Sequence, residues 1–516
     1  MTSTDSDIRS SPEILYRWFP SSRFLTASLL CICYASIHMM NSNMGMAIIC
    51  MVNSTEYDDN SENILANMPM PIILLSNNSI FDGNNTKVYT IPNLIGAPKV
   101  NWSSEEQGYV FGAFNIGLLS MLIIGLIADK INAKYMIIAA MLIASVANFL
   151  IGFASSLSVN IAIGGRLLVG VSDALLQPAA NSLLTRWFPP SERSYALGLA
   201  TGGRQIGSLV IMPVAGTLCN QNAFFGGWPS IFYLSASVGL FFIIVFLCIG
   251  ADKPSKQFLI TDSELHFIMK SIACEDAGKK RIERKIKWRP IITSAPVWAG
   301  IISVVCHEYP LMTMIMFLPS YLHDVYHYKA TENGFLSALP TAALWISKIV
   351  SSYLNTLLLQ RTNFRRTTIS KMLNTVGSAG LSVFLYSVTL LDSKNASLAV
   401  VFLCISMAFT GLHTPGCQAS LVSIAPAYSG AITGLAFFFV AIAGIVNPII
   451  TKWIVQDGSP LQWNLIFYIS TIIAFIPVIV FNIWGSADVQ RWAIMDERKT
   501  KSSSQAAKNA VIPATK

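Results

Sequence analysis

A cation and a carboxylate in one apolar segment are the residues of this sequence best placed to do chemistry. Arg166 and Asp173 lie within residues 160–183, a stretch apolar enough to cross a membrane. A charge in hydrocarbon costs roughly 2.5–3.5 kcal/mol on insertion scales, so such residues usually serve a function. Their spacing places them on one face of a helix, roughly 10 Å apart. The pattern predicts an anion site beside a protonatable group.

Arg204 is a second arginine inside an apolar segment, about nine residues or roughly 13 Å from its start. Asp173 lies at a similar depth in the preceding segment. We predict that the two side chains pair, which would leave Arg166 for a substrate. The alternative is that Arg204 reaches toward the membrane surface or binds helix carbonyl groups.

The second half of the chain carries three further candidates, namely His307, Glu308 and Lys348. Histidine titrates between neutral and acidic compartments, which makes His307 a candidate for proton coupling, although a packed, hydrogen-bonded histidine is the alternative. Glu308 is a second candidate for coupling, and it could form a buried pair with Lys348. Lys348 could instead extend to the membrane surface. His38 and His413 are predicted to line the core or a cavity.

The composition indicates that these residues belong to a polytopic membrane protein. Of 516 residues, 53% are hydrophobic and 12% charged, against about 25% charged in soluble proteins. The net charge of +8 is assigned to membrane orientation rather than to nucleic-acid binding. The nine cysteines are odd in number, lie mostly in apolar runs and form no CxxC pair. We expect buried thiols rather than disulfides or a metal site.

Twelve apolar segments of about 20 residues must position the charged residues, and each is long enough to cross a bilayer. They cover residues 24–52, 108–128, 134–154, 159–183, 196–218, 229–250, 296–318, 334–357, 372–391, 397–418, 430–452 and 464–485. The predicted fold is an all-α membrane protein with two six-helix halves, residues 24–251 and 296–485. Residues 1–23, 252–295 and 486–516 form the polar and basic connections and ends.

Two signals predict the orientation of the chain. Residues 53–105 hold the glycosylation patterns at Asn77, Asn84 and Asn101, and Asn395 falls on the same side. The basic segments fall on the other side, which places both termini in the cytosol. The membrane is the plasma membrane or that of a lysosome or vesicle.

Two sequence motifs lie in predicted cytosolic turns. Residues 125–134 read GLIADKINAK and include Asp129 and Lys130; residues 186–193 read RWFPPSER and include Glu192 and Arg193. With two halves of six spans, the first motif resembles the cytosolic signature of major facilitator transporters. The resemblance implies substrate binding between the halves and a gating role for these four charges, and the alternative is an ordinary charged loop.

The second motif, preceded by Arg166 and an acid seven residues later, resembles the anion:cation symporter branch of that superfamily. This branch contains sialin, the vesicular glutamate transporters and the type I sodium–phosphate cotransporters. The resemblance covers residues 24–485 and implies that Arg166 binds the substrate anion and Asp173 couples protons. Family arginines in the first and seventh spans correspond to Asn41 and His307, which we include among the substrate-binding positions. The loss of both arginines argues against a dicarboxylate substrate.

We therefore predict a secondary transporter of organic or inorganic anions that works by alternating access with proton coupling. The alternatives are a sodium-dependent phosphate or anion cotransporter and a non-transporting sensor on the same scaffold. We expect no enzymatic activity, no cofactor and no metal, and the sequence contains no nucleotide-binding GxxxxGK[ST] motif. The expected partners are a small anion, H+ or Na+, and the lipid bilayer, with the protein as a monomer.

Overall fold

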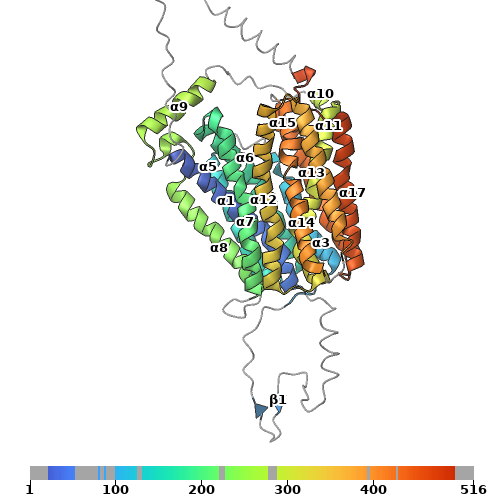
Figure 1. Ribbon diagram of the computed structural model, residues 1–516. Helices are drawn as coiled ribbons and strands as arrows, with labels where there is room; N and C mark the ends of the chain where they lie inside the picture. Colours follow the sequence, from blue (N-terminus) through green and yellow to red (C-terminus); the bar gives the residue numbers. More distant parts are fainter. Residues whose placement is uncertain are drawn as a thin grey trace, which may run out of the picture.

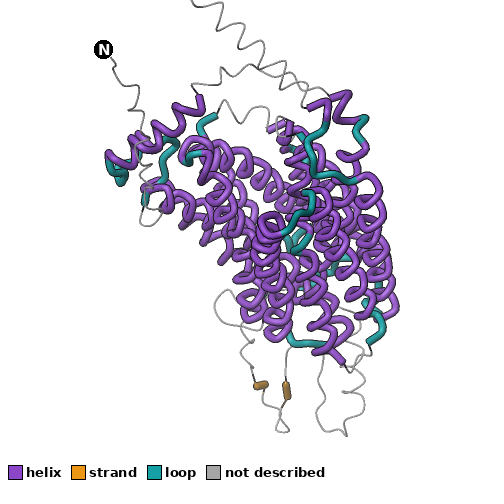
Figure 2. The backbone as a smooth tube through the Cα atoms, turned by 45° about the horizontal axis from the view of Figure 1, so that its top comes forward, coloured by secondary structure: helices purple, strands orange, loops and turns teal. Residues whose placement is uncertain are grey.

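A computed structural model describes residues 21–52, 80–81, 87–88, 99–121, 123–124, 131–219, 227–276, 288–391, 395–425 and 428–493. The described chain is almost entirely helical, and its long helices lie side by side in one bundle (Figure 1). The all-α prediction is confirmed apart from two strands of two residues each, β1 (Ile80–Phe81) and β2 (Lys87–Val88). They lie at the end of the molecule opposite α9 (Figure 1), and Figure 2 shows both strands in orange beyond one end of the helices.

Six helices of the first half cross the bundle. They are α1 (Ser22–Met51), α3 (Ser104–Leu118), α5 (Ala133–Ala154), α6 (Val159–Trp187), α7 (Pro190–Cys219) and α8 (Trp228–Ile249). Side-chain caps fix several of their starts: the Ser21 side chain accepts a hydrogen bond from the Phe24 N–H, and Ser103 and Glu106 form a capping box. Local sequence therefore sets where these helices begin.

The second half has the same number of membrane-crossing segments. They are α11 (Ala295–Tyr326), α12 (Ala330–Arg361), α13 (Arg366–Val388), α14 (Ala396–Thr410), α16 (Ser429–Ile454) and α17 (Pro460–Trp484). The segment of α14 continues through a π-helix, η4 (Thr414–Gln418), into α15 (Ala419–Ile424). Pro415 lacks an N–H, which explains why the regular α-helical ladder is interrupted there.

Three short elements connect the halves, where the sequence predicted only a basic loop. They are η2 (Pro254–Lys256), α9 (Asp262–Asp276) and α10 (Trp288–Ile292). Among the described residues, nine helical segments are long and apolar enough to cross a membrane. With α3, α7 and α13, which are shorter or more polar, the described part of the chain contains the twelve expected segments. α11 is eight residues longer at its end than the predicted span.

The two halves meet mainly through three helix pairs, α1 with α11, α3 with α16 and α7 with α12, and α1 also touches α12. Glycines permit the closest approaches. A Cβ at Gly45 would lie 3.0 Å from the Met316 carbonyl oxygen, and one at Gly216 would lie 3.1 Å from the Cα of Gly334. These contacts lie at the end of the bundle that carries Asn101, which we call the Asn101 end. We call the opposite end, where α9 lies, the α9 end (Figure 1).

A disulfide between Cys50 and Cys219 joins α1 to α7 at the Asn101 end. The prediction that all cysteines are buried thiols is wrong for this pair. The two residues are 169 positions apart in the sequence, yet each ends a long helix, and the packing of α1 on α7 brings their Cα atoms to 5.9 Å. That separation is within the range that a disulfide needs.

Charged side chains join the first-half helices at the α9 end. Arg23 is fully buried at the start of α1, where it pairs with Glu192 of α7 and with Glu264 of α9, the latter at 3.2 Å. Arg186, in the last turn of α6, contacts Asp252 at 2.6 Å. These pairs fix α9 and the chain after α8 against the first half of the bundle.

Candidate functional site

Arg166 lies in the interior of the bundle with an exposed fraction of 1%. Its guanidinium donates to the Asn41 backbone oxygen and to Asn41 Oδ1, both at 2.9 Å, and lies over the Phe114 ring at 5.5 Å. Arg166 is thus held by neutral groups of α1, and it pairs with no carboxylate among the described residues. Its Nε has no hydrogen-bond partner in the described part of the chain.

Arg204 and Asp173 do pair, as the sequence predicted. Arg204 Nη2 donates to Asp173 Oδ1 at 3.2 Å and to Gln177 Oε1 at 2.8 Å. The Arg204 guanidinium carbon lies over the Tyr34 ring, 4.9 Å from its centroid. The Tyr34 hydroxyl donates to the same Gln177 oxygen at 3.0 Å. The carboxylate is 3% exposed and the arginine 28%, so the pair has one buried and one partly accessible member.

His38 of α1 completes this group, although the sequence predicted only that it lines the core or a cavity. Its Nε2 lies 4.0 Å from Asp173 Oδ2, and the imidazole is 16% exposed. A signal was available in the sequence, because His38 precedes Asn41 by three residues and follows Tyr34 by four. Helical spacing places all three residues on one face of α1. We call Tyr34, His38, Asp173, Gln177 and Arg204 the Asp173 cluster.

Glu308 of α11 and Lys348 of α12 face the Asp173 cluster from the second half. Glu308 interacts electrostatically with Lys348 and with Arg204, and Lys348 interacts with His38. Neither residue forms an ion pair within 4.0 Å among the described residues, so the possible direct pair between them is not formed. The charges of both halves nevertheless meet near the midpoints of α6, α7, α11 and α12.

His307 lies apart from the charges, inside the second half. It is 1% exposed, its Nε2 is 2.8 Å from Ser378 Oγ, and its ring lies 4.2 Å from that of His413. This placement favours the interpretation of a packed, hydrogen-bonded histidine. His413, expected in the core or a cavity wall, is also buried. The helical register of α11 turns His307 into its own half, whereas the neighbouring Glu308 faces the other.

The structure covers the predicted gating residues only in part. Asp129 and Lys130 lie outside the described residues. Glu192 pairs with Arg23 of the same half, and Arg193 belongs to α7 with its side chain outside the description. Glu192 therefore ties α7 to α1 in this conformation, and it forms no hydrogen bond or ion pair with a described residue of the second half.

The structure describes two of the four predicted glycosylation sites. Asn77 and Asn84 lie outside the described residues, whereas Asn101 and Asn395 are exposed. Asn101 precedes α3 and Asn395 precedes α14, and both helices start at the end that holds the disulfide. The two described sites thus share one end of the bundle.

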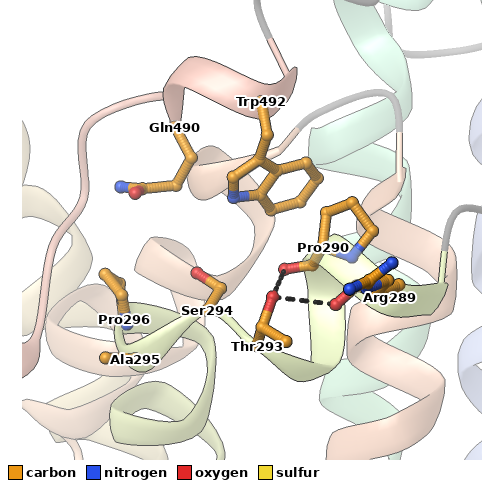
Figure 3. Close-up of a pocket in the computed structure, with 8 residues that line it drawn as sticks. All are labelled: Arg289, Pro290, Thr293, Ser294, Ala295, Pro296, Gln490 and Trp492. Carbon is orange, nitrogen blue, oxygen red and sulfur yellow. Dashed lines mark hydrogen bonds between the residues drawn. The ribbon is translucent and has the colours of Figure 1, made fainter.

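The described residues contain no group of three or more His, Cys, Asp or Glu side chains arranged to hold a metal ion. A surface pocket of about 490 Å³ lies at the start of α11, lined by Arg289, Ser294, Gln490 and Trp492 among others (Figure 3). It is open and lies at the α9 end, far along α11 from Glu308. Arg289 is its one charged lining residue, so the charged site in the interior remains the candidate functional site.

A bundle of twelve membrane helices with charged side chains from both halves near its middle has the architecture of a membrane transporter. The sequence from residue 30 to residue 448 matches the model of the Major Facilitator Superfamily. The chain belongs to this family, whose members are transporters and not enzymes.

Named relatives agree with the predicted branch. The chain is 27% identical to sialin from Homo sapiens over 478 residues, 92% of each chain. It is 29% identical to a probable small intestine urate exporter from Homo sapiens, over 95% of this chain and 96% of the relative. It is 28% identical to a putative inorganic phosphate cotransporter from Drosophila melanogaster, over 94% and 89%. The resemblance to the sialin and phosphate-cotransporter branch is thereby confirmed.

The fold is also that of solved transporters. A bacterial homolog of the human lysosomal transporter Spinster, in an inward-facing and occupied conformation, superposes with a TM-score of 0.63. The match covers 90% of this chain and 96% of the other at 13% identity. It confirms the predicted major facilitator architecture.

Proposed function

We propose that this protein is a secondary active transporter that moves a small organic or inorganic anion by alternating access, coupled to protons. The observation that carries the proposal is the charge balance at the middle of the bundle. Arg166, Arg204 and Lys348 supply three cations, and Asp173 and Glu308 supply two carboxylates. Such charges are expensive in a membrane, and one positive charge in excess favours a monoanion.

Coupling to protons follows from the same balance. Protonation of one carboxylate raises the excess from one positive charge to two, which strengthens the attraction for an anion. Proton and anion binding then favour each other, and by linkage the effect is reciprocal. In this proposal Arg166 and Asn41 bind the substrate, Asp173 takes up the proton with Glu308 or His307 as further coupling residues, and the halves rock around the site.

The proposed orientation places the Asn101 end in the lumen or outside the cell and both termini in the cytosol. Disulfides form in oxidising compartments, and glycosylation sequons are used there. The exposed Asn101 and Asn395 and the Cys50–Cys219 disulfide all lie at that end. In this orientation Asp129, Lys130, Glu192 and Arg193 belong to the cytosolic gate, and the unit is the monomer. The membrane is the plasma membrane or that of a lysosome or vesicle.

The test is uptake of labelled sialic acid, urate, glutamate and phosphate into proteoliposomes, with proton, sodium and voltage gradients varied separately. We expect uptake driven by a proton gradient and at least tenfold lower in Arg166→Gln. Arg361→Gln is the matched control, because Arg361 is an exposed arginine at the end of α12. Absence of flux for every anion, from protein shown to be folded, would favour a non-transporting sensor.

A second candidate function is sodium-dependent anion cotransport. The similarity to a putative inorganic phosphate cotransporter favours it. The proteoliposome assay separates the two functions, since phosphate uptake that requires external sodium at constant pH supports the second. In that case the protonatable residues of the site would serve the binding of the anion alone.

A further inference from the structure

The Asp173 cluster contains a histidine to which the proposed mechanism assigns no task, and it stands beside the one carboxylate that is paired. Asp173 uses Oδ1 for Arg204, whereas Oδ2 has no hydrogen bond among the described residues and faces His38 Nε2 at 4.0 Å. Nε2 likewise has no hydrogen-bond partner among them. A charge-assisted hydrogen bond needs about 2.7–2.9 Å, so a movement of roughly 1 Å would form one.

Two cationic groups can therefore compete for one carboxylate. With a neutral His38, Arg204 holds Asp173. With a protonated His38, the imidazolium gives Asp173 a second cationic partner from α1, and the bond to Arg204 weakens. Arg204 would remain in place, because Gln177 Oε1 accepts from it at 2.8 Å and the Tyr34 ring lies beneath it. It would then present a guanidinium without a carboxylate partner.

The charges around His38 make the change of partner at Asp173, from Arg204 to His38, sensitive to a bound anion. The groups that act on His38 are Asp173 of α6, Arg204 of α7 and Lys348 of α12, and Glu308 of α11 acts in turn on Arg204 and Lys348. Burial disfavours a positive charge on His38, Arg204 and Lys348 repel that charge, and Asp173 attracts it. An anion bound at Arg204 would offset that repulsion. The proton on His38 and the anion on Arg204 would therefore stabilise each other.

We infer that His38 is the proton acceptor of the site and that its protonation releases Arg204 from Asp173 to bind the carboxylate or phosphate group of the substrate. The inference rests on the proposed function of proton-coupled anion transport but moves the proton from Asp173 to His38. It also adds a second anion-binding arginine and the order of the charge exchange. Asp173 stays ionised throughout, and the proton enters and leaves at His38 Nε2.

The test compares His38→Gln with the wild type in proteoliposomes, using the anion with the highest wild-type uptake. Glutamine keeps a hydrogen-bonding group but cannot carry the proton. For a single linked proton, the KM of the wild type should fall by up to about tenfold per pH unit on acidification between pH 7 and 5. In His38→Gln we expect the KM to change less than twofold over the same range.

His323→Gln is the matched control, because His323 also faces a carboxylate, with its Nδ1 3.3 Å from Asp324 Oδ1. It lies near the end of α11, away from the Asp173 cluster, and its variant should keep the wild-type pH slope. If His38→Gln is not recovered as folded protein, the smaller His38→Asn carries the same test. A variant that retains the full slope would overturn the inference while leaving anion transport intact. No uptake by the wild type would instead reject the proposed function.

Discussion

Arg204 and Asp173 allow a double-mutant cycle whose outcome follows from their surroundings. Arg204→Gln leaves a 3%-exposed carboxylate with only His38 nearby, at 4.0 Å. Breaking a buried pair costs roughly 3–5 kcal/mol, and we expect about 3 kcal/mol because the arginine is partly exposed. Asp173→Asn should cost only about 1 kcal/mol, since Gln177 and Tyr34 still hold the arginine. The double variant should also lose about 1 kcal/mol, because no charge is left unpaired.

The free energy of unfolding would be measured by chemical denaturation of the purified protein, followed by circular dichroism. The expected coupling energy is about 2–3 kcal/mol. Arg186→Gln is the matched control, because it removes the arginine from the Arg186–Asp252 pair at the α9 end. Asp252 then still accepts a hydrogen bond from the backbone N–H of Ala133 at 3.2 Å. Arg186→Gln should cost less than Arg204→Gln, about 1–2 kcal/mol, because this N–H still hydrogen-bonds to the carboxylate. Additivity of the two single changes within about 0.5 kcal/mol would refute the reasoning.

Three further outcomes are expected. Gly203→Val should abolish folding, because a Cβ there would overlap a backbone carbonyl of α1, whereas Gly198→Ala on the same helix meets no atom within 4 Å and should behave as wild type in size-exclusion chromatography. Cys50→Ser should lower the unfolding free energy by about 3 kcal/mol and expose one new thiol to maleimide labelling, and a thiol count that falls by one would exclude the disulfide. Asn101→Gln and Asn395→Gln should each remove one glycan, seen as a shift in mass after glycosidase treatment, and a glycan-free wild type would contradict the orientation.

The sequence predicted the membrane-crossing segments, because their length and apolar composition are local patterns. The pairing of Asp173 with Arg204 could be predicted since both lie at similar depth on consecutive segments. The contacts of Arg166 could not, because they depend on how α1 is rotated against α6. The same rotation brings His38 to Asp173 and decides that Glu308, not His307, faces the first half.

The disulfide could not be predicted from the sequence either. Cys50 and Cys219 each end an apolar segment, and nothing in their spacing indicates that the first and fifth helices are neighbours. Only the packed bundle brings them together. The short helix α9 also escaped prediction, because its pairing with Arg23 and the start of α1 depends on the placement of α9 beside the bundle.

The links at both ends of α1 and α7 have a mechanical consequence. The disulfide joins the two helices at one end, and Arg23 with Glu192 joins them at the other, so the pair should turn as one rigid lever. In the proposed alternating access, the close contacts of Gly45 and Gly216 with the second half would be its pivot. A helix of 30 residues is about 45 Å long, so a rotation of about 10° would displace its far end by roughly 8 Å. The lever would carry α9 with it, so an antibody fragment that holds α9 should arrest the rocking of the halves without touching the site.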